Sequence, residues 1–148
     1  MEHREAFGDL GEPELQSDAV PFDKTDYYHE IAPELSRVFV SFPGLVNPEG
    51  LADWKHQAIA IEAQSREPVR AVTIDPGYVD GARLVLASTK DHAHRIYLRD
   101  GIFAEVTMRY RFRKWASFDY TFPDFASGVY DEFLCSVRKM WLMEAKNV

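Results

Sequence analysis

Side chains able to transfer protons, bind anions or hold a metal ion are concentrated between residues 75 and 105. Two histidines separated by one residue, His92 and His94, are followed directly by Arg95. The other charged side chains of the group are Asp75, Lys90, Asp91 and Glu105. Imidazole and carboxylate groups suit acid–base catalysis, and guanidinium groups recognise phosphate and carboxylate. We therefore place the candidate site in this stretch, where the residues suit either catalysis or binding.

The two histidines raise the possibility of a divalent metal. If residues 92–94 are extended, both imidazoles point the same way, because side chains alternate along a strand. Two imidazoles with a carboxylate such as Asp75 or Asp124 are a typical ligand set for zinc or iron. No third ligand stands at a diagnostic spacing. A hydrogen-bonded core histidine at His94 is the commoner arrangement, so metal binding by His92, His94 and Asp75 has this structural alternative.

A β-hairpin is expected to bring Arg95 and Glu105 together. Arg99-Asp100-Gly101 is typical of a three-residue hairpin loop with glycine in the left-handed position. This loop sets Ile96 opposite Ala104, whereas a two-residue Asp-Gly turn would set Glu105 among apolar side chains. The Arg95–Glu105 pair could hold the guanidinium toward an anionic ligand. Alternatively, it is a structural cross-strand ion pair contributing about 0.2–1 kcal/mol.

The second strand of this hairpin is predicted from an alternating pattern over residues 102–113. One face is expected to be apolar and to contain Ile102, Ala104, Val106, Met108, Tyr110 and Phe112. The opposite face would present Arg109, Arg111 and Arg113 beside Phe103. Arginines beside an aromatic ring could bind an acidic protein or single-stranded RNA, and a solvated strand face is the alternative.

Three further candidates are expected near element ends. Asp75 follows a predicted strand at 69–74, so it could be a general base or metal ligand, or a plain turn residue. Lys90 closes a predicted short helix at 80–90, where an ammonium could bind an anion or complement the helix dipole. Asp124 joins Lys90, Arg95 and Glu105 among the expected ligand-binding residues.

Composition and length predict one globular domain over residues 1–148. Cys135 is the only cysteine, so no internal disulfide can form, and its place in the last predicted helix favours a buried thiol. The absence of a disulfide favours a reducing, cytoplasmic setting. The sequence contains no apolar signal core and no run long enough for a membrane span, so no membrane partner is expected.

Charge is distributed unevenly along the chain. The net charge is −7, and residues 1–34 contain ten acidic and two basic residues. Residues 83–115 contain eight basic and three acidic residues. The overall acidity argues against a general nucleic-acid binder, while the basic hairpin could attract a small anion locally.

The pattern of predicted elements indicates an α+β domain with helices packed on a mainly antiparallel sheet. Residues 1–20 are expected to contain a remnant helix end at 2–7 and a flexible acidic segment. Asn47 and Pro48 are typical of a helix start, and Ser127 of the start of the last helix. The other expected elements are an irregular strand or turn at 21–28, strands at 37–42 and 118–122, and a helix from 48 to 64.

Several strings resemble one protein family, the domain of unknown function numbered 4416, whose members are bacterial and archaeal. The strings are PFDKTDYY, DPGY, LVLASTKD-x-AHRIYL, GIFAEVTMRY and TFPDF, and the resemblance spans about residues 5–140. It implies a ferredoxin-like first half whose first strand this chain lacks, and an uncovered sheet edge could then pair in a homodimer. The chain departs from the family pattern at Ile59, where members have Asn, and at Tyr120-Thr121-Phe122, where members have Trp-Thr-Tyr.

Two functions from different classes are therefore expected. The first is binding of, or catalysis on, a small anionic metabolite or nucleotide in a crevice between the 74–78 turn and the 92–107 hairpin. The alternative is a non-catalytic interaction module that uses Arg109, Arg111 and Arg113.

Overall fold

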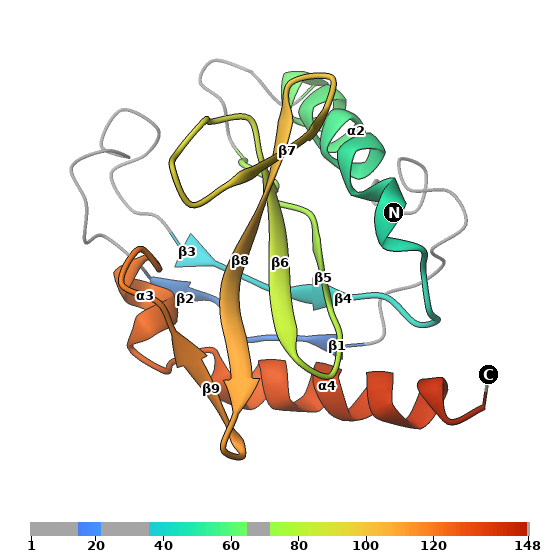
Figure 1. The fold of residues 1–148 in the computed structure, drawn as a ribbon, viewed down its shortest axis with the longest axis vertical. Coiled ribbons are helices and arrows are strands. Elements are labelled where there is room, and N and C mark those ends of the chain that lie inside the picture. The colour runs from blue at the N-terminus through green and yellow to red at the C-terminus, as the bar shows by residue number, and fades with distance from the viewer. Residues whose placement is uncertain (1–14, 22–35, 65–71, 148) are drawn as a thin grey trace.

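The computed structural model describes residues 15–21, 36–64 and 72–147 as a five-stranded antiparallel sheet with helices against both faces (Figure 1). This confirms the predicted α+β class. The elements are β1 (Leu15–Gln16), β2 (Val20–Pro21), β3 (Ser36–Arg37), β4 (Val40–Ser41), η3 (Pro48–Gly50), α2 (Leu51–Gln64), β5 (Gly77–Val79), β6 (Arg83–Ser88), β7 (Ile96–Arg99), β8 (Ile102–Arg111), β9 (Lys114–Ser117), α3 (Pro123–Ala126) and α4 (Asp131–Ala145). None of the described helices is both long and apolar enough to cross a membrane.

The sheet has the order β5-β6-β8-β7, and β9 also pairs with β8. The long strand β8 is shared along one edge, because β7 pairs with its first part and β9 with its last part. Two small ladders, β1–β4 and β2–β3, lie outside this sheet. Among the described strands β5 is one outer edge, while β7 and β9 together form the other, and pairing of such an edge with a second copy stays a prediction.

The prediction of a short helix at 80–90 is wrong, because residues 83–88 form the central strand β6. Leu84 and Leu86 pack toward α4, while Val85 and Ala87 pack toward α2. A strand buried on both faces has a continuous apolar sequence, which short-range periodicity cannot distinguish from a buried helix. Five strands therefore follow α2 without an intervening helix, and the ferredoxin-like order is not formed in the described residues.

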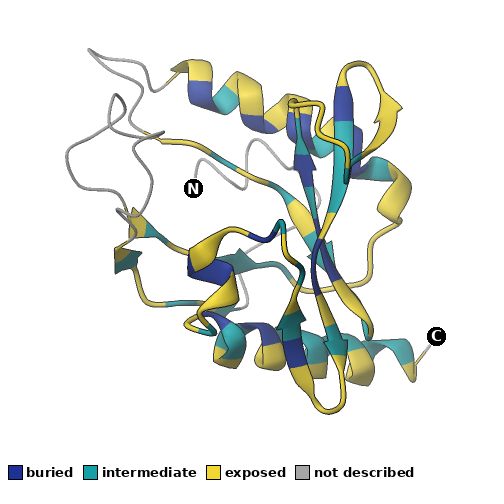
Figure 2. Cartoon of the chain, turned by 60° about the vertical axis from the view of Figure 1, so that its left-hand side comes forward, coloured by how far each residue is buried: buried dark blue, intermediate teal, exposed yellow. Residues whose placement is uncertain are grey.

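A one-residue bulge in β8 turns its apolar side chains from one face of the sheet to the other. The ladder pairs Val85 with Val106 but Leu84 with Met108, so Thr107 is the additional residue. Ile102 consequently belongs to the cluster under α2, while Met108 belongs to the cluster against α4. The predicted single apolar face of residues 102–112 is therefore wrong beyond Val106. Figure 2 shows the buried positions along the central strands and on α2 and α4.

On the side of β8 away from β6, no described strand pairs with the backbone at the bulge, since β7 ends before it and β9 begins after it. Side chains from residues 118–121 fill this gap. Tyr120 donates a hydrogen bond to the carbonyl of Val106, and Thr121 donates one of 2.8 Å to the carbonyl of Thr107. Thr121 Oγ1 also accepts a bond from the amide of Phe118. This segment is therefore not the predicted strand at 118–122, and β9 precedes it.

The β7–β8 hairpin keeps the predicted pairing with a different turn. Ile96 pairs with Ala104 as predicted, but Arg99 pairs with Ile102, so the turn is the two-residue Asp100-Gly101. Both turn residues have positive φ, 51° and 80°, as hairpin turns of this length require. A bulge after Tyr97 restores the pairing that we expected from a longer loop.

The region before the hairpin also differs from expectation. Residues 72–74 form no strand, and Gly77 lies in β5 instead of ending a strand. A Cβ at Gly77 would lie 2.2 Å from the carbonyl oxygen of Val85, so glycine is required by the close approach of β5 to β6. The predicted strand at 37–42 is interrupted between β3 and β4. The expectations for residues 2–14 and 22–28, and the part of the 69–74 strand before residue 72, lie outside the described residues.

The long helices match the predicted positions. Asn47 caps the first turn by accepting a 3.0 Å hydrogen bond from the amide of Glu49. Leu51 and Ala58 of α2 are buried, as are Tyr130 and Leu134 at the start of α4. Ser127 does not cap α4; it lies just after α3, and its hydroxyl donates to the carbonyl of Asp124.

Cys135 lies on the exposed side of α4, so the prediction of a buried thiol is wrong. The nearby apolar residues Leu134 and Val137 are less exposed than Cys135. Consecutive residues of an α-helix are about 100° apart, so Cys135 points away from the apolar side that contains Leu134, and its side chain is exposed.

Replacing Thr121 by Val should destabilise the fold by about 1–3 kcal/mol, because the carbonyl of Thr107 and the amide of Phe118 would lose their partner. Urea unfolding followed by circular dichroism measures the difference. The matched control is Thr89→Val at an exposed position. Equal stability of the two variants would contradict the role assigned to Thr121.

Candidate functional site

Glu105 is the centre of a partly buried polar cluster on the sheet face that carries Leu86 and Phe103. One carboxylate oxygen, Oε1, lies 2.7 Å from His94 Nε2 and 3.0 Å from Arg95 Nε. The other oxygen, Oε2, accepts a 2.8 Å hydrogen bond from Thr107 Oγ1. The side chains of Glu105 and Arg95 are only 12% and 10% exposed. The predicted meeting of Arg95 and Glu105 is therefore confirmed.

Arg95 also holds the loop that connects β6 to β7. Its Nη1 donates to Ser88 Oγ at 3.0 Å and to the carbonyl of Lys90 at 3.1 Å. The amide of Arg95 donates to the carbonyl of His92, which closes a turn directly before β7. One guanidinium thus connects β6, the loop and β8, so it organises the cluster as well as carrying charge.

His94 lies in a column of nearly parallel rings. Its ring centroid is 3.9 Å from that of Tyr120 with an interplanar angle of 13°, and 5.9 Å from that of His92. Tyr120 in turn stacks on Phe118 at 5.2 Å. Stacking holds the imidazole plane while Glu105 holds Nε2, so His94 has one defined orientation.

The environment of Glu105 favours the ionised carboxylate. Burial alone would raise the pKa of Glu105, but the hydrogen bonds from Thr107, His94 and Arg95 together hold the pKa below its ordinary value. A carboxylate can only accept hydrogen bonds, so His94 Nε2 must carry a proton. In neutral His94 the lone pair is then on Nδ1, which is the tautomer of a carboxylate-oriented general base.

Lys90 and Arg95 place two positive charges near the two histidines, and the charge of Arg95 is paired with Glu105. Partial burial lowers the pKa of Lys90, and the neighbouring Arg95 charge lowers it further. Two adjacent cations repel each other, and an anion bound beside them would remove part of that repulsion. The arrangement can therefore bind an anion next to a positioned imidazole.

Asp75 does not join this cluster. Its carboxylate lies 3.2 Å from Nζ of Lys55 on α2, and the same ammonium donates to the carbonyl of Ile74. Lys55 is 7% exposed in its side chain, so the pair fastens the segment before β5 to α2. Within the described residues Asp75 forms no hydrogen bond or ion pair with His92, His94 or Glu105, so these candidates lie in two separate places.

Asp124 is also separate from Glu105. Its Oδ2 accepts a 2.7 Å hydrogen bond from the Tyr130 hydroxyl and lies 2.9 Å from Arg37 Nε. Burial raises the pKa of Tyr130, and the bond to Asp124 raises it further. These contacts join β3, α3 and α4, so in the described residues Asp124 belongs to the packing of the domain.

The predicted metal site is not assembled in the part of the chain that the structure describes. That part contains no group of three or more His, Cys, Asp or Glu side chains that could hold a metal ion. The near-parallel stacking of His92 and His94 places two imidazoles side by side, while Glu105 is already bonded to His94, Arg95 and Thr107.

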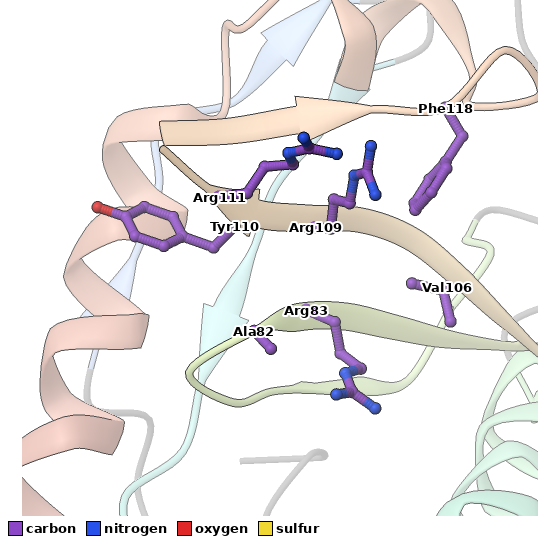
Figure 3. A pocket seen from close by; sticks show the side chains of 7 residues that line it. All are labelled: Ala82, Arg83, Val106, Arg109, Tyr110, Arg111 and Phe118. Carbon is purple, nitrogen blue, oxygen red and sulfur yellow. The ribbon is translucent and has the colours of Figure 1, made fainter. Parts of the chain in front are cut away.

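A second feature is an open hollow of about 460 Å³ on the face of the sheet that also carries Val85 (Figure 3). Its lining residues are Ala82, Arg83, Val106, Arg109, Tyr110, Arg111 and Phe118. Arg109 and Arg111 share one face as predicted, but Phe103 lies on the other face because of the bulge. Arg113 is in the β8–β9 turn with φ 63° instead of on the strand, and Arg83 takes part in its place.

Sequence reasoning missed Ser88, Thr107 and Tyr120 in the first cluster and Arg83 and Phe118 in the hollow. Ser88 and Arg83 were assigned to or beside a helix, so their place beside β8 was not considered. Thr107 and Tyr120 gain their roles from the bulge, which has no signature in the sequence. The sequence pattern placed Tyr120 and Thr121 in a strand at 118–122 and gave neither residue a place in a site.

The family of the chain follows from its sequence match. A model of the domain of unknown function DUF4416 matches residues 3–141. The chain belongs to this family. No curated protein and no solved structure matches the chain. The DUF4416 match thus agrees with the resemblance seen in the sequence, while the chemistry must be argued from the residues themselves.

Replacing Glu105 by Gln should lower stability by about 3 kcal/mol at neutral pH, because Arg95 would be buried beside a neutral group. Since folding lowers the pKa of Glu105, its contribution is present above the ordinary value of 4.5 and is lost as the pH falls through the folded-state pKa. The difference between wild type and Glu105→Gln should therefore shrink in acid.

Urea unfolding at a series of pH values measures this difference. Glu132→Gln at an exposed position in the first turn of α4 is the matched control and should show a difference of at most about 1 kcal/mol, the contribution of a carboxylate near a helix N-terminus. A gap between wild type and Glu105→Gln that is the same at pH 3 and pH 7 would show that the Glu105 charge is not what stabilises the cluster.

Proposed function

We propose that this protein binds a small anionic metabolite, such as a nucleotide or another phosphate-bearing molecule, beside His94. The observation that carries the proposal is that Glu105 Oε1 accepts hydrogen bonds from both His94 Nε2 and Arg95 Nε. One buried carboxylate thereby fixes an imidazole and a guanidinium relative to each other. Such an arrangement is typical of sites in which an anion and a proton-transfer group must be held together.

The roles of the residues follow from their positions. Lys90 and His92 are exposed and would contact the ligand directly. His94 is 26% exposed and would face the ligand with Nδ1, as a hydrogen-bond partner or as the base of a reaction. Arg95 and Glu105 would orient the His94 imidazole and the loop that carries Lys90 without contacting the ligand, because their polar atoms already bond to neighbouring protein atoms.

The test is a thermal-shift and calorimetric screen of nucleotides, sugar phosphates and dicarboxylates. At least one of these anions should raise the Tm of the wild type. The shift should be lost in the double variant Lys90→Gln, His94→Gln. Glutamine at position 94 can still donate to Glu105, so this variant should stay folded.

Lys139→Gln, which removes an exposed charge from α4, is the control and should bind normally. The proposal would be abandoned if no anion stabilised the wild type, or if the double variant kept the full shift.

A further inference from the structure

A strongly basic surface lies on the sheet face opposite the Glu105 cluster. It consists of Arg83, Arg109, Arg111 and Lys114, and it is called the arginine face here. Three of the four line the open hollow, and no carboxylate is among the described residues that line it (Figure 3). Lys114 pairs with Arg111 across β8 and β9 and therefore lies on the same side.

The arginine face places like charges directly opposite each other. Arg83 pairs with Arg109 in the β6–β8 ladder, and Arg111 pairs with Lys114 in the β8–β9 ladder. Like charges at directly opposed positions destabilise a sheet. Asp80 relieves only Arg83, at 3.7 Å and with the arginine half exposed. A bound polyanion would convert this repulsion into attraction.

Aromatic rings hold the two central arginines. The guanidinium carbon of Arg109 lies 5.2 Å from the centroid of the Phe118 ring, and that of Arg111 lies 4.3 Å from the centroid of Phe112. These contacts restrain the planar groups but use none of their N–H donors. The donors are available for the two-bond recognition of phosphate that arginine favours.

The hairpin tip adds an exposed aromatic ring. Phe112 is 78% exposed and adopts φ 52°, next to Arg113 with φ 63°. Phe112 and Arg113 are the two central residues of the β8–β9 turn, where a hairpin of this length requires positive φ, and neither is the glycine or asparagine that accepts this conformation most readily. The β8–β9 turn extends past α4 at the edge of the molecule in Figure 1 and is coloured as exposed in Figure 2. The ring of Phe112 is thus placed to stack on a base.

We propose that the arginine face binds a single-stranded nucleic acid, with phosphates along Arg83, Arg109 and Arg111 and a base on Phe112. An open hollow would leave most of a small molecule in water, whereas a chain can run across it. Side chains two residues apart on a strand are about 7 Å apart, close to the separation of neighbouring phosphates in an extended strand. Stacking with charge is the usual chemistry of single-strand binding.

Fluorescence anisotropy with labelled oligouridylate of about 12 nucleotides tests this proposal at low salt. The wild type should bind, and the logarithm of its affinity should fall with the logarithm of salt with a slope of about −2 to −3 for three or four contacts. The double variant Arg109→Gln, Arg111→Gln should bind at least about tenfold more weakly, with a slope smaller by about 1.4.

Phe112→Gly is a second variant, in which loss of RNA binding could not be attributed to unfolding. Glycine accepts positive φ without strain, so the Tm should rise while RNA affinity falls by about fivefold or more. Lys139→Gln with Lys146→Gln removes two exposed charges elsewhere and should leave both affinity and slope nearly unchanged.

Three results would overturn the proposal: no binding by the wild type at low salt, the same loss in the lysine control as in the arginine variant, or full RNA affinity in Phe112→Gly. Polyglutamate that competes as effectively as RNA would assign the face to an acidic protein and would likewise exclude the nucleic acid. The Lys90, His94 double variant should bind RNA normally, so this proposal and the metabolite site fail or succeed separately.

Discussion

The structure depends on the additional residue in β8 opposite the Leu84–Val85 step of β6. A strand without this bulge would keep Ile102 and Met108 on one face, because side chains alternate. With the bulge, the first half of β8 packs under α2 and the second half packs against α4. One strand thereby supplies two apolar clusters on opposite faces of one sheet.

The same bulge determines where polar side chains are exposed. On each face an apolar cluster occupies one end of the sheet, and charged residues occupy the end that the helix leaves open. Glu105 therefore faces one side with His94 and Arg95, while Arg109 and Arg111 face the other. The two proposed sites share a strand but not a surface, so each can be tested with the other intact.

The gap beside the bulge connects the two surfaces. Tyr120 and Thr121 bond to the carbonyls that β7 and β9 leave unpaired. Tyr120 then stacks between His94 and Phe118, and Arg109 lies over Phe118. The segment that supplies hydrogen-bond donors to the unpaired β8 carbonyls at the bulge must pass along the edge of β8. This path explains why the rings of His94, Tyr120 and Phe118 form one column.

The sequence by itself determined the α+β class, both long helices, the Ile96–Ala104 pairing and the Arg95–Glu105 pair. Each of these depends on local periodicity, caps or turn chemistry, which nearby residues specify. Only the tertiary structure decided that residues 83–88 form a central strand, that Asp75 pairs with Lys55, and that Arg83 faces Arg109. Burial on both faces and a one-residue change of register arise from packing between distant segments, so no local pattern encodes them.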